Sequence, residues 1–386
     1  MIINYQILKK EGVMFVRVNR DNFKKVLKKV EGVTDKKATM AILSMVLVNP
    51  MVEANLIELT ATDLEMGYRV QVPVEIEGEG APFCVPAKKF YEIIKNFPED
   101  ELLLKLEKSR LIIRDAEERI TYSLAITNSE EFPSLPEFIE KQGINILGSV
   151  LSELINGTIF CTSKDEPRFV LNGIFFEPLK EESKLRAVAS DGHRLVYLER
   201  EVEGLGEVDL GDGFIIARKA ARQMEAIANE ESVVRLAFVN NHVVLRTPNS
   251  VFFSRTIEGA FPDYRSVIPT SNKNILRVDR KLFIDALKRV SLVATEKFKP
   301  VTITLKEGEI ILTSQETEMG RAETKLSAEY EGEPLSVNYN AQYLLDALEA
   351  MKSEEIEMKI GEEKTPAMIT GYRDEGFLYL VMPMVF

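Results

Sequence analysis

The sequence predicts an α+β fold in which one domain of helices and antiparallel strands occurs three times. Apolar residues recur at helical spacing in six segments, and segments that alternate apolar and polar residues lie between them. The length of 386 residues agrees with this prediction, because domains usually contain roughly 100–200 residues, which allows two or three in this chain.

The six predicted helices form three pairs. Their apolar stripes, at i, i+3, i+4 and i+7, cover residues 23–30, 90–97, 147–154, 217–224, 283–290 and 344–351. The second helix of each pair starts its stripe at residues 90, 217 and 344, a constant interval of 127 residues. Solenoid units are roughly 20–50 residues long, so this repeat is a whole domain.

Half-buried strands are predicted between the helices, where the alternation has a period of two. The clearest segments are residues 110–115, 120–126, 233–238 and 301–314. A sheet that is apolar on one face must bury that face, most simply under the two helices of its own repeat. Each repeat is therefore expected to be a pair of helices packed on antiparallel strands.

Two Phe-Pro pairs, at Phe132 and Phe261, mark the connections between repeats. Proline fixes φ and removes a backbone donor, so it suits a connection between sheets better than a sheet interior. We expect domains at residues 14–140, 141–272 and 273–386.

Residues 1–13 are expected to be a non-native or disordered extension. Lys10-Glu11-Gly12 can be encoded by AAG-GAG-G, a purine-rich ribosome-binding sequence just before Met14. The hypothesis is that Met14 is the true start, and an intact mass that includes Met1 in the native host would refute it.

The composition excludes several classes of protein. Only two cysteines, Cys84 and Cys161, and two histidines are present, which excludes a disulfide framework and a Cys/His metal site. We expect no metal and no cofactor.

The sequence also contains no predicted membrane segment. No run approaches the roughly 18 apolar residues of a membrane helix, and the N-terminus lacks a signal-peptide core. We therefore interpret the protein as cytoplasmic with no membrane partner.

Positive charge gathers on four of the six predicted helices, although the whole chain has a net charge of −12. Residues 20–30 carry a net charge of +4, and residues 85–95, 217–226 and 279–289 each carry +2. One interpretation is an ordinary solvated helix face. The other is that repeats close into a ring with basic helices inward, around a polyanion whose phosphates they contact without reading bases. The candidate phosphate-facing side chains are Lys24, Lys28, Lys88, Arg218, Arg222 and Lys281.

Two motifs leave alternatives open. Ser190, Asp191 and His193 could suggest a hydrolase, but neighbours on one turn do not converge as a catalytic triad does, and Asp-Gly is typical of a tight hairpin. Residues 377–386 end in Met-Pro-Met-Val-Phe, which fits either a final strand or an apolar groove for a partner peptide.

Several segments resemble, in order and spacing, the bacterial DNA polymerase III beta subunits, the sliding clamp family. The matching segments are TATDLEMG (60–67), VPAKKF (85–90), RFVLNGIFFE (168–177), SDGHRL (190–195), FPDYRSVIP (261–269) and YLVMPM (379–384). The resemblance implies three similar clamp domains per chain and a head-to-tail homodimer that closes into a ring around double-stranded DNA.

The resemblance also implies site residues. The partner-peptide pocket would consist of Leu171, Ser190, Gly192, His193, Arg194, Leu195, Pro262, Val267, Pro366, Val381, Met382, Pro383 and Met384. It adds Lys37, Arg168 and Lys219 to the DNA-facing residues, and Leu292 and Val293 at the dimer interface.

The implied function involves no bond chemistry and no catalytic residue. A ring linked topologically to DNA would tether the replicative polymerase and other clamp-binding proteins. No nucleotide-binding motif is present, so opening of the ring would require a separate ATP-driven clamp loader. The rival function is a hydrolase using Asp191 and His193.

Overall fold

The computed structural model describes residues 14–35, 39–107, 109–137, 143–163, 167–293, 299–314, 320–361 and 364–385. Within them lie six α-helices and many antiparallel strands, so the predicted α+β class is confirmed. The proposed extension at residues 1–13 lies outside this range. None of the helices among the described residues is long and apolar enough to cross a membrane.

Each predicted apolar stripe lies on one helix. The helices are α1 (Arg20–Val33), α2 (Ala87–Asn96), α3 (Gly148–Asn156), α4 (Arg218–Ala228), α5 (Arg280–Ser291) and α6 (Ala341–Ala350). Three of them begin with the same device, because the side chains of Asn19, Asp279 and Asn340 accept hydrogen bonds from backbone N–H groups of the first helical turn. In α1 the stripe buries Phe23, Leu27 and Val30.

The described chain forms two compact units. One contains the residues up to Ser149 together with Arg222–Thr256, and the other contains Val150–Ala221 together with the residues from Ile257 on. The middle repeat is divided between them because its strands pair with both neighbours. Strand β18 (Ser250–Ile257) pairs with β4 (Met66–Pro73), whereas β14 (Arg194–Glu201) pairs with β27 (Phe377–Val381). Sheets therefore continue from one repeat into the next.

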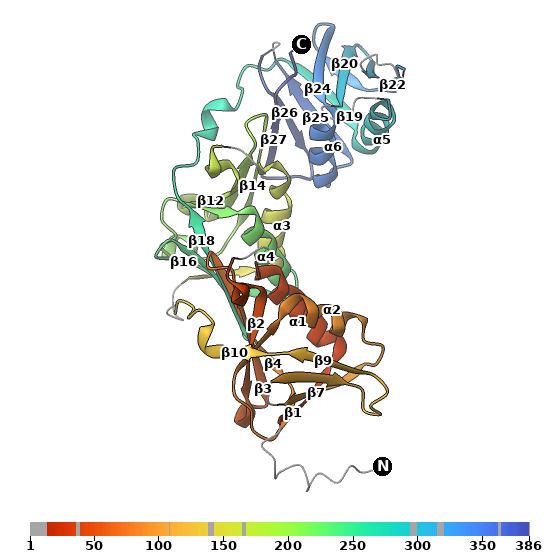
Figure 1. The fold of residues 1–386 in the computed structure, drawn as a ribbon. Helices are drawn as coiled ribbons and strands as arrows, with labels where there is room; N and C mark the ends of the chain where they lie inside the picture. Colours follow the sequence, from red (N-terminus) through yellow and green to blue (C-terminus); the bar gives the residue numbers. More distant parts are fainter. Residues whose placement is uncertain are drawn as a thin grey trace. The chain divides into compact units, whose positions relative to one another are not determined.

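The first unit contains a five-stranded antiparallel sheet and a second set of strands. The sheet has the order β5 (Glu75–Glu77), β1 (Met14–Asn19), β7 (Glu101–Glu107), β8 (Arg110–Arg114), β9 (Thr121–Ala125). The other strands are β2 (Met45–Met51), β3 (Leu56–Thr62), β4, β6 (Phe83–Pro86), β10 (Thr127–Asn128), β11 (Ile144–Leu147), β16 (Val233–Val239), β17 (His242–Arg246) and β18. Helices α1 and α2 lie side by side (Figure 1), with the rings of Phe23 and Phe90 edge to face at 5.6 Å.

The second unit also contains two groups of strands. A four-stranded sheet has the order β22 (Glu323–Ser327), β21 (Glu309–Ser314), β20 (Pro300–Lys306), β24 (Leu335–Asn340). The other strands are β12 (Gly173–Leu179), β13 (Lys184–Ser190), β14, β15 (Phe214–Ala217), β19 (Asn274–Asp279), β23 (Glu329–Glu331), β25 (Glu355–Ile360), β26 (Ala367–Gly371) and β27. Antiparallel pairing of β13, β14, β27 and β26 makes the surface on which the candidate site lies.

Candidate functional site

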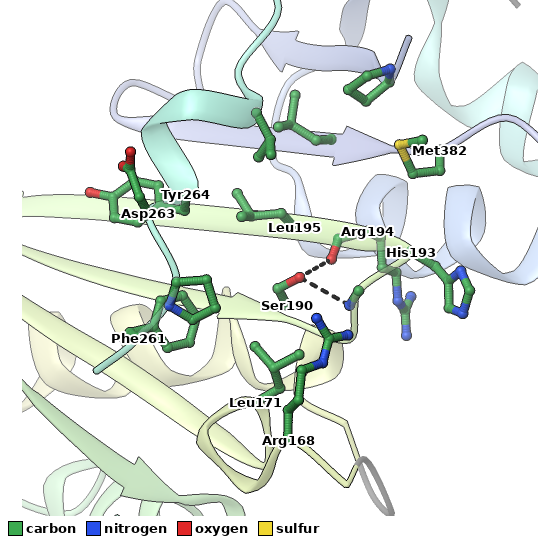
Figure 2. A pocket seen from close by; sticks show the side chains of 15 residues that line it. Arg168, Leu171, Ser190, His193, Arg194, Leu195, Phe261, Asp263, Tyr264 and Met382 are labelled. Carbon is green, nitrogen blue, oxygen red and sulfur yellow. Dashed lines mark hydrogen bonds between the residues drawn. The ribbon is translucent and has the colours of Figure 1, made fainter. Parts of the chain in front are cut away.

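A cavity of about 220 Å³ opens beside strands β14 and β27 in the second unit (Figure 2). It collects ten of the residues that the resemblance implies for a partner-peptide pocket: Leu171, Ser190, Gly192, His193, Arg194, Leu195, Pro262, Val267, Pro366 and Met382. These residues come from segments up to about 200 positions apart, so strand pairing brings them together.

The floor of the cavity is apolar because two leucines are paired in register. Leu195 of β14 lies directly opposite Leu380 of β27, and both are buried. Val188, Tyr264 and Leu378 complete the same apolar cluster. An apolar side chain of a ligand that packs on this floor would therefore be shielded from water.

Three predicted pocket residues are not among the side chains that line the cavity. Val381 is fully buried, and since side chains alternate along a strand it lies on the opposite face from Leu380 and Met382. Pro383 and Met384 follow the end of β27, where the Met384 N–H donates to the carbonyl oxygen of Asn338 at 2.8 Å.

The segment Ser190–Arg194 forms a tight hairpin at the mouth of the cavity. Gly192 has a φ of 87°, in the left-handed region. The Ser190 hydroxyl donates to the Arg194 carbonyl oxygen at 2.8 Å and accepts from the Gly192 N–H at 3.1 Å. One Asp191 carboxylate oxygen accepts from the backbone N–H groups of His193 and Arg194. These bonds use the serine and the aspartate to build the turn, and they do not assemble a nucleophile and a base, so the hydrolase alternative is unsupported.

Arg194 is a largely buried cation, with its side chain 9% exposed, and its donors are directed into the protein. Its guanidinium donates to Asp191 at 2.9 Å, to Asp346 at 2.6 Å and to the Phe160 carbonyl oxygen at 2.9 Å. Burial by itself would lower the pKa of Arg194, but its neighbours Cys161, Tyr379 and Asp346 outweigh burial and raise this pKa. Arg194 therefore stays charged and joins β14 to α6.

The rim of the cavity combines exposed apolar groups with polar ones. Val267 and Met382 are 50% and 39% exposed, so they are available to a ligand. The Met382 N–H donates to the His193 carbonyl oxygen at 2.9 Å, which holds the end of β27 against the hairpin. Arg168, expected to face DNA, lies at this rim. Its guanidinium is close to the hairpin, because a Cβ atom placed on Gly192 would lie 2.9 Å from Arg168 Nη2.

Sequence reasoning missed four residues that line the cavity: Phe261, Asp263, Tyr264 and Leu380. The Phe-Pro signal identified the segment at Phe261 only as a connection. In the structure Phe261 stacks on Phe175, with ring centroids 5.2 Å apart, and Tyr264 is almost fully buried. The connection is therefore also a wall of the site.

The predicted basic side chains on the helices differ in their surroundings. Lys28, Lys88 and Lys281 are exposed, and Lys24 donates to Asp21 at 3.2 Å. Lys219 and Arg222 are also exposed at the level of the whole residue. Arg218 instead donates from one nitrogen to the Ile159 carbonyl oxygen and to both oxygens of Thr162, so it holds the turn after α3. Lys37 lies outside the described residues.

The two residues expected at a dimer interface follow α5. Leu292 is 84% exposed, and Val293 is half-buried. An apolar side chain as exposed as Leu292 is shielded from water only if something covers it.

Three family models match consecutive parts of the chain. The DNA polymerase III beta subunit N-terminal domain matches residues 14–136, the central domain matches residues 145–263 and the C-terminal domain matches residues 265–385. The predicted threefold organisation is thus confirmed at the level of domain families.

Relatives match over nearly the whole length. The beta sliding clamp of Haemophilus influenzae is 30% identical over 373 residues, which is 95% of this chain and 98% of the relative. Among solved structures, the Thermotoga maritima DNA polymerase III beta subunit has a TM-score of 0.88 at 28% identity and covers 97% of this chain and 100% of its own. A Bartonella birtlesii sliding clamp bound to griselimycin has a TM-score of 0.88 at 31% identity, with the same coverage.

Proposed function

The chain belongs to the DNA polymerase III beta subunit family, and we propose on this premise that it is the sliding clamp of a replicative DNA polymerase. The observation that carries the proposal is the match of all three domain models in order, from residue 14 to residue 385. The protein is a processivity factor and performs no catalysis. It works in the cytoplasm, together with an ATP-driven clamp loader.

Two copies of the chain form a head-to-tail ring of six clamp domains around double-stranded DNA. The domains span residues 14–140, 141–272 and 273–386, and Leu292 and Val293 contribute to the joint between copies. The 84% exposure of Leu292 supports this role. Light scattering tests it, because a closed ring requires the mass of two chains at micromolar concentration.

DNA contact is electrostatic and independent of sequence. The exposed Lys28, Lys88, Lys219, Arg222 and Lys281 meet phosphates with flexible side chains, and Lys24 joins them. We assign the same role to Lys37 on the resemblance alone. Such contacts are weak and sensitive to salt, so a topologically linked ring can slide. Because Arg218 and Arg168 are engaged within the protein or at the pocket rim, we assign them a smaller part in DNA contact.

The cavity beside Leu195 and Leu380 receives an apolar segment of the polymerase or of another clamp-binding protein. Its buried apolar floor and its exposed Met382 and Val267 support this assignment. Of the remaining implied pocket residues, Val381, Pro383 and Met384 act by shaping the end of β27. Tethering through such a pocket raises the effective concentration of the polymerase at the primer end.

Primer extension tests the function. With a clamp loader, ATP and the replicative polymerase of the same host, the wild-type chain should lengthen the products of single binding events at least tenfold. Met382→Glu places a charge at the rim and should abolish this gain, whereas Val385→Glu, at an exposed residue outside the cavity, should not. Equal product lengths with and without the wild-type chain would refute the proposal.

A further inference from the structure

One wall of the pocket is a short turn that follows the connection between the second and third repeats. It is the 3₁₀ turn Tyr264–Val267, which carries Tyr264 and Val267 into the cavity lining. The Ile268 N–H donates to the Arg265 carbonyl oxygen at 3.2 Å, and the Ser266 hydroxyl donates to the Asp263 carbonyl oxygen at 2.7 Å. Both bonds lie within the segment, so they shape the turn without attaching it to the sheet.

The sheet under this turn carries a row of three charged residues. Glu177 of β12, Arg186 of β13 and Glu199 of β14 are paired in register across neighbouring strands. Arg186 donates from Nε and Nη2 to one oxygen of Glu199, at 2.9 and 2.6 Å, and its guanidinium lies 4.6 Å from the centroid of the Tyr197 ring. These contacts fix the planar guanidinium, so the direction of its remaining nitrogen, Nη1, is also fixed.

Two residues of this row, Glu177 and Arg186, form hydrogen bonds with two consecutive residues of the turn, Tyr264 and Arg265. Arg186 Nη1 donates to the Tyr264 hydroxyl at 2.8 Å, and this hydroxyl donates to Glu177 Oε2 at 2.5 Å. The other oxygen of Glu177 accepts from Arg265 Nη2 at 2.7 Å. Burial and the bond to Glu177 raise the pKa of Tyr264 to about 12, so the hydroxyl remains a donor near neutral pH.

We propose that Glu177 and Arg186 are positioning residues that hold the Tyr264–Val267 turn in place, so that the pocket wall is already formed when a partner segment arrives. Neither residue lines the cavity, so a ligand in it would contact neither. This inference rests on the proposed function of the pocket. If the turn is held only part of the time, the apparent dissociation constant rises by the inverse of the competent fraction.

The test compares variants of the full-length protein by calorimetric titration with griselimycin, the compound bound to the Bartonella birtlesii relative. Arg186→Met removes the bond to Tyr264 and should weaken binding about tenfold, the loss expected for one charge-assisted hydrogen bond. Lys184→Met is the matched control, because Lys184 is on the same strand and also bonds Glu199 but does not contact the turn. Its binding should stay within about twofold of wild type.

A double-mutant cycle separates positioning from general destabilisation. Tyr264→Phe keeps the buried ring and removes only the hydroxyl through which Arg186 acts. In this background Arg186→Met should cost less than about twofold in affinity, because the two changes remove the same bond. Hydrogen exchange at the Ile268 amide should accelerate in both single variants, while the amides of β13 and β14 keep their protection.

Three results would overturn the inference: wild-type affinity in Arg186→Met, an equal loss in Lys184→Met, or the full tenfold loss persisting in the Tyr264→Phe background. Failure of the folded wild-type chain to bind griselimycin is a different result. It would overturn the proposed pocket, and this inference with it.

Discussion

Arg194 Nη1 donates to Asp346 Oδ2 over 2.6 Å and so joins strand β14 to helix α6 across 152 positions of the chain. The same guanidinium lies 4.2 Å from the centroid of the Tyr343 ring, also on α6. Arg194 therefore serves the pocket by fixing the elements around it, and its side chain is only 9% exposed.

Removing Asp346, the acidic partner of Arg194 on α6, should lower the stability of the folded protein. Asp346→Ala leaves a buried cation with one fewer hydrogen bond, and we expect the free energy of unfolding to fall by about 2–3 kcal/mol. Glu349→Ala on the same helix is the control, because its ion pair with Lys288 is exposed and should contribute less than about 1 kcal/mol. Urea denaturation measures both, and equal losses would contradict this role of Asp346.

Glu153 should make the protein sensitive to acid. Hydrogen bonds from Arg200, and to a smaller extent from Lys352, lower the pKa of Glu153 to about 2 although burial acts to raise it. A lowered pKa in the folded state means that the stabilisation is present above the unfolded pKa of about 4.3 and is lost as the pH falls toward 2.

The matching variant is Glu153→Gln. It should be less stable than wild type at pH 7, by about 1 kcal/mol because the site is partly exposed to solvent. The difference should shrink between about pH 4.5 and pH 2, where wild-type Glu153 takes up its proton. Denaturation at a series of pH values checks this, and a difference that is constant across the range would rule out Glu153 as the titrating group.

Replacing Gly192 should weaken ligand binding in the pocket, whereas replacing Gly204, in the same unit, should lower only stability. Gly192→Ala forces a φ of 87° on an alanine and places its Cβ 2.9 Å from Arg168 Nη2 at the pocket rim. Gly204→Ala imposes a similar φ of 75° with no atom within 4 Å of the added Cβ. Each should cost about 1 kcal/mol of stability. Only Gly192→Ala should weaken griselimycin binding, and equal binding by the two variants would argue against a pocket role for the hairpin.

The exposed lysines on α1 and α2 should set the salt dependence of DNA contact. Lys28→Ala combined with Lys88→Ala should reduce the slope of log affinity against log salt concentration by about 0.9 for each phosphate that a lysine no longer neutralises, or roughly 2 in total. Lys325→Ala and Lys359→Ala, on strands β22 and β25, form the control pair. Titration of duplex DNA at several salt concentrations gives the slopes, and an unchanged slope in the α1 and α2 variant would place DNA contact elsewhere.

Local patterns predicted the elements well. Stripes such as Phe23, Leu27 and Val30 repeat with the helical period, and Asp191-Gly192 forms the tight turn that Asp-Gly favours. These signals arise from residues close in sequence, so they can be seen without knowing the fold.

The composition of the site was harder to predict. The register that sets Leu195 opposite Leu380 depends on long-range strand pairing, and the resemblance supplied most of the pocket residues that the structure brings together. Arg218 fits a basic helix face in sequence, but its guanidinium bends back to Thr162, which charge patterning cannot reveal. Tyr264 was missed because its role depends on Glu177 and Arg186, nearly 90 and 80 positions away.

Release from linearised DNA tests the central claim most directly. The wild-type chain is loaded by a clamp loader onto nicked circular DNA, freed from the loader by gel filtration, and the circle is then cut once. A ring held by topology should stay on the circle through a high-salt wash and leave within minutes once free ends exist. Retention on the linear DNA, or loss from the uncut circle in high salt, would contradict a sliding clamp.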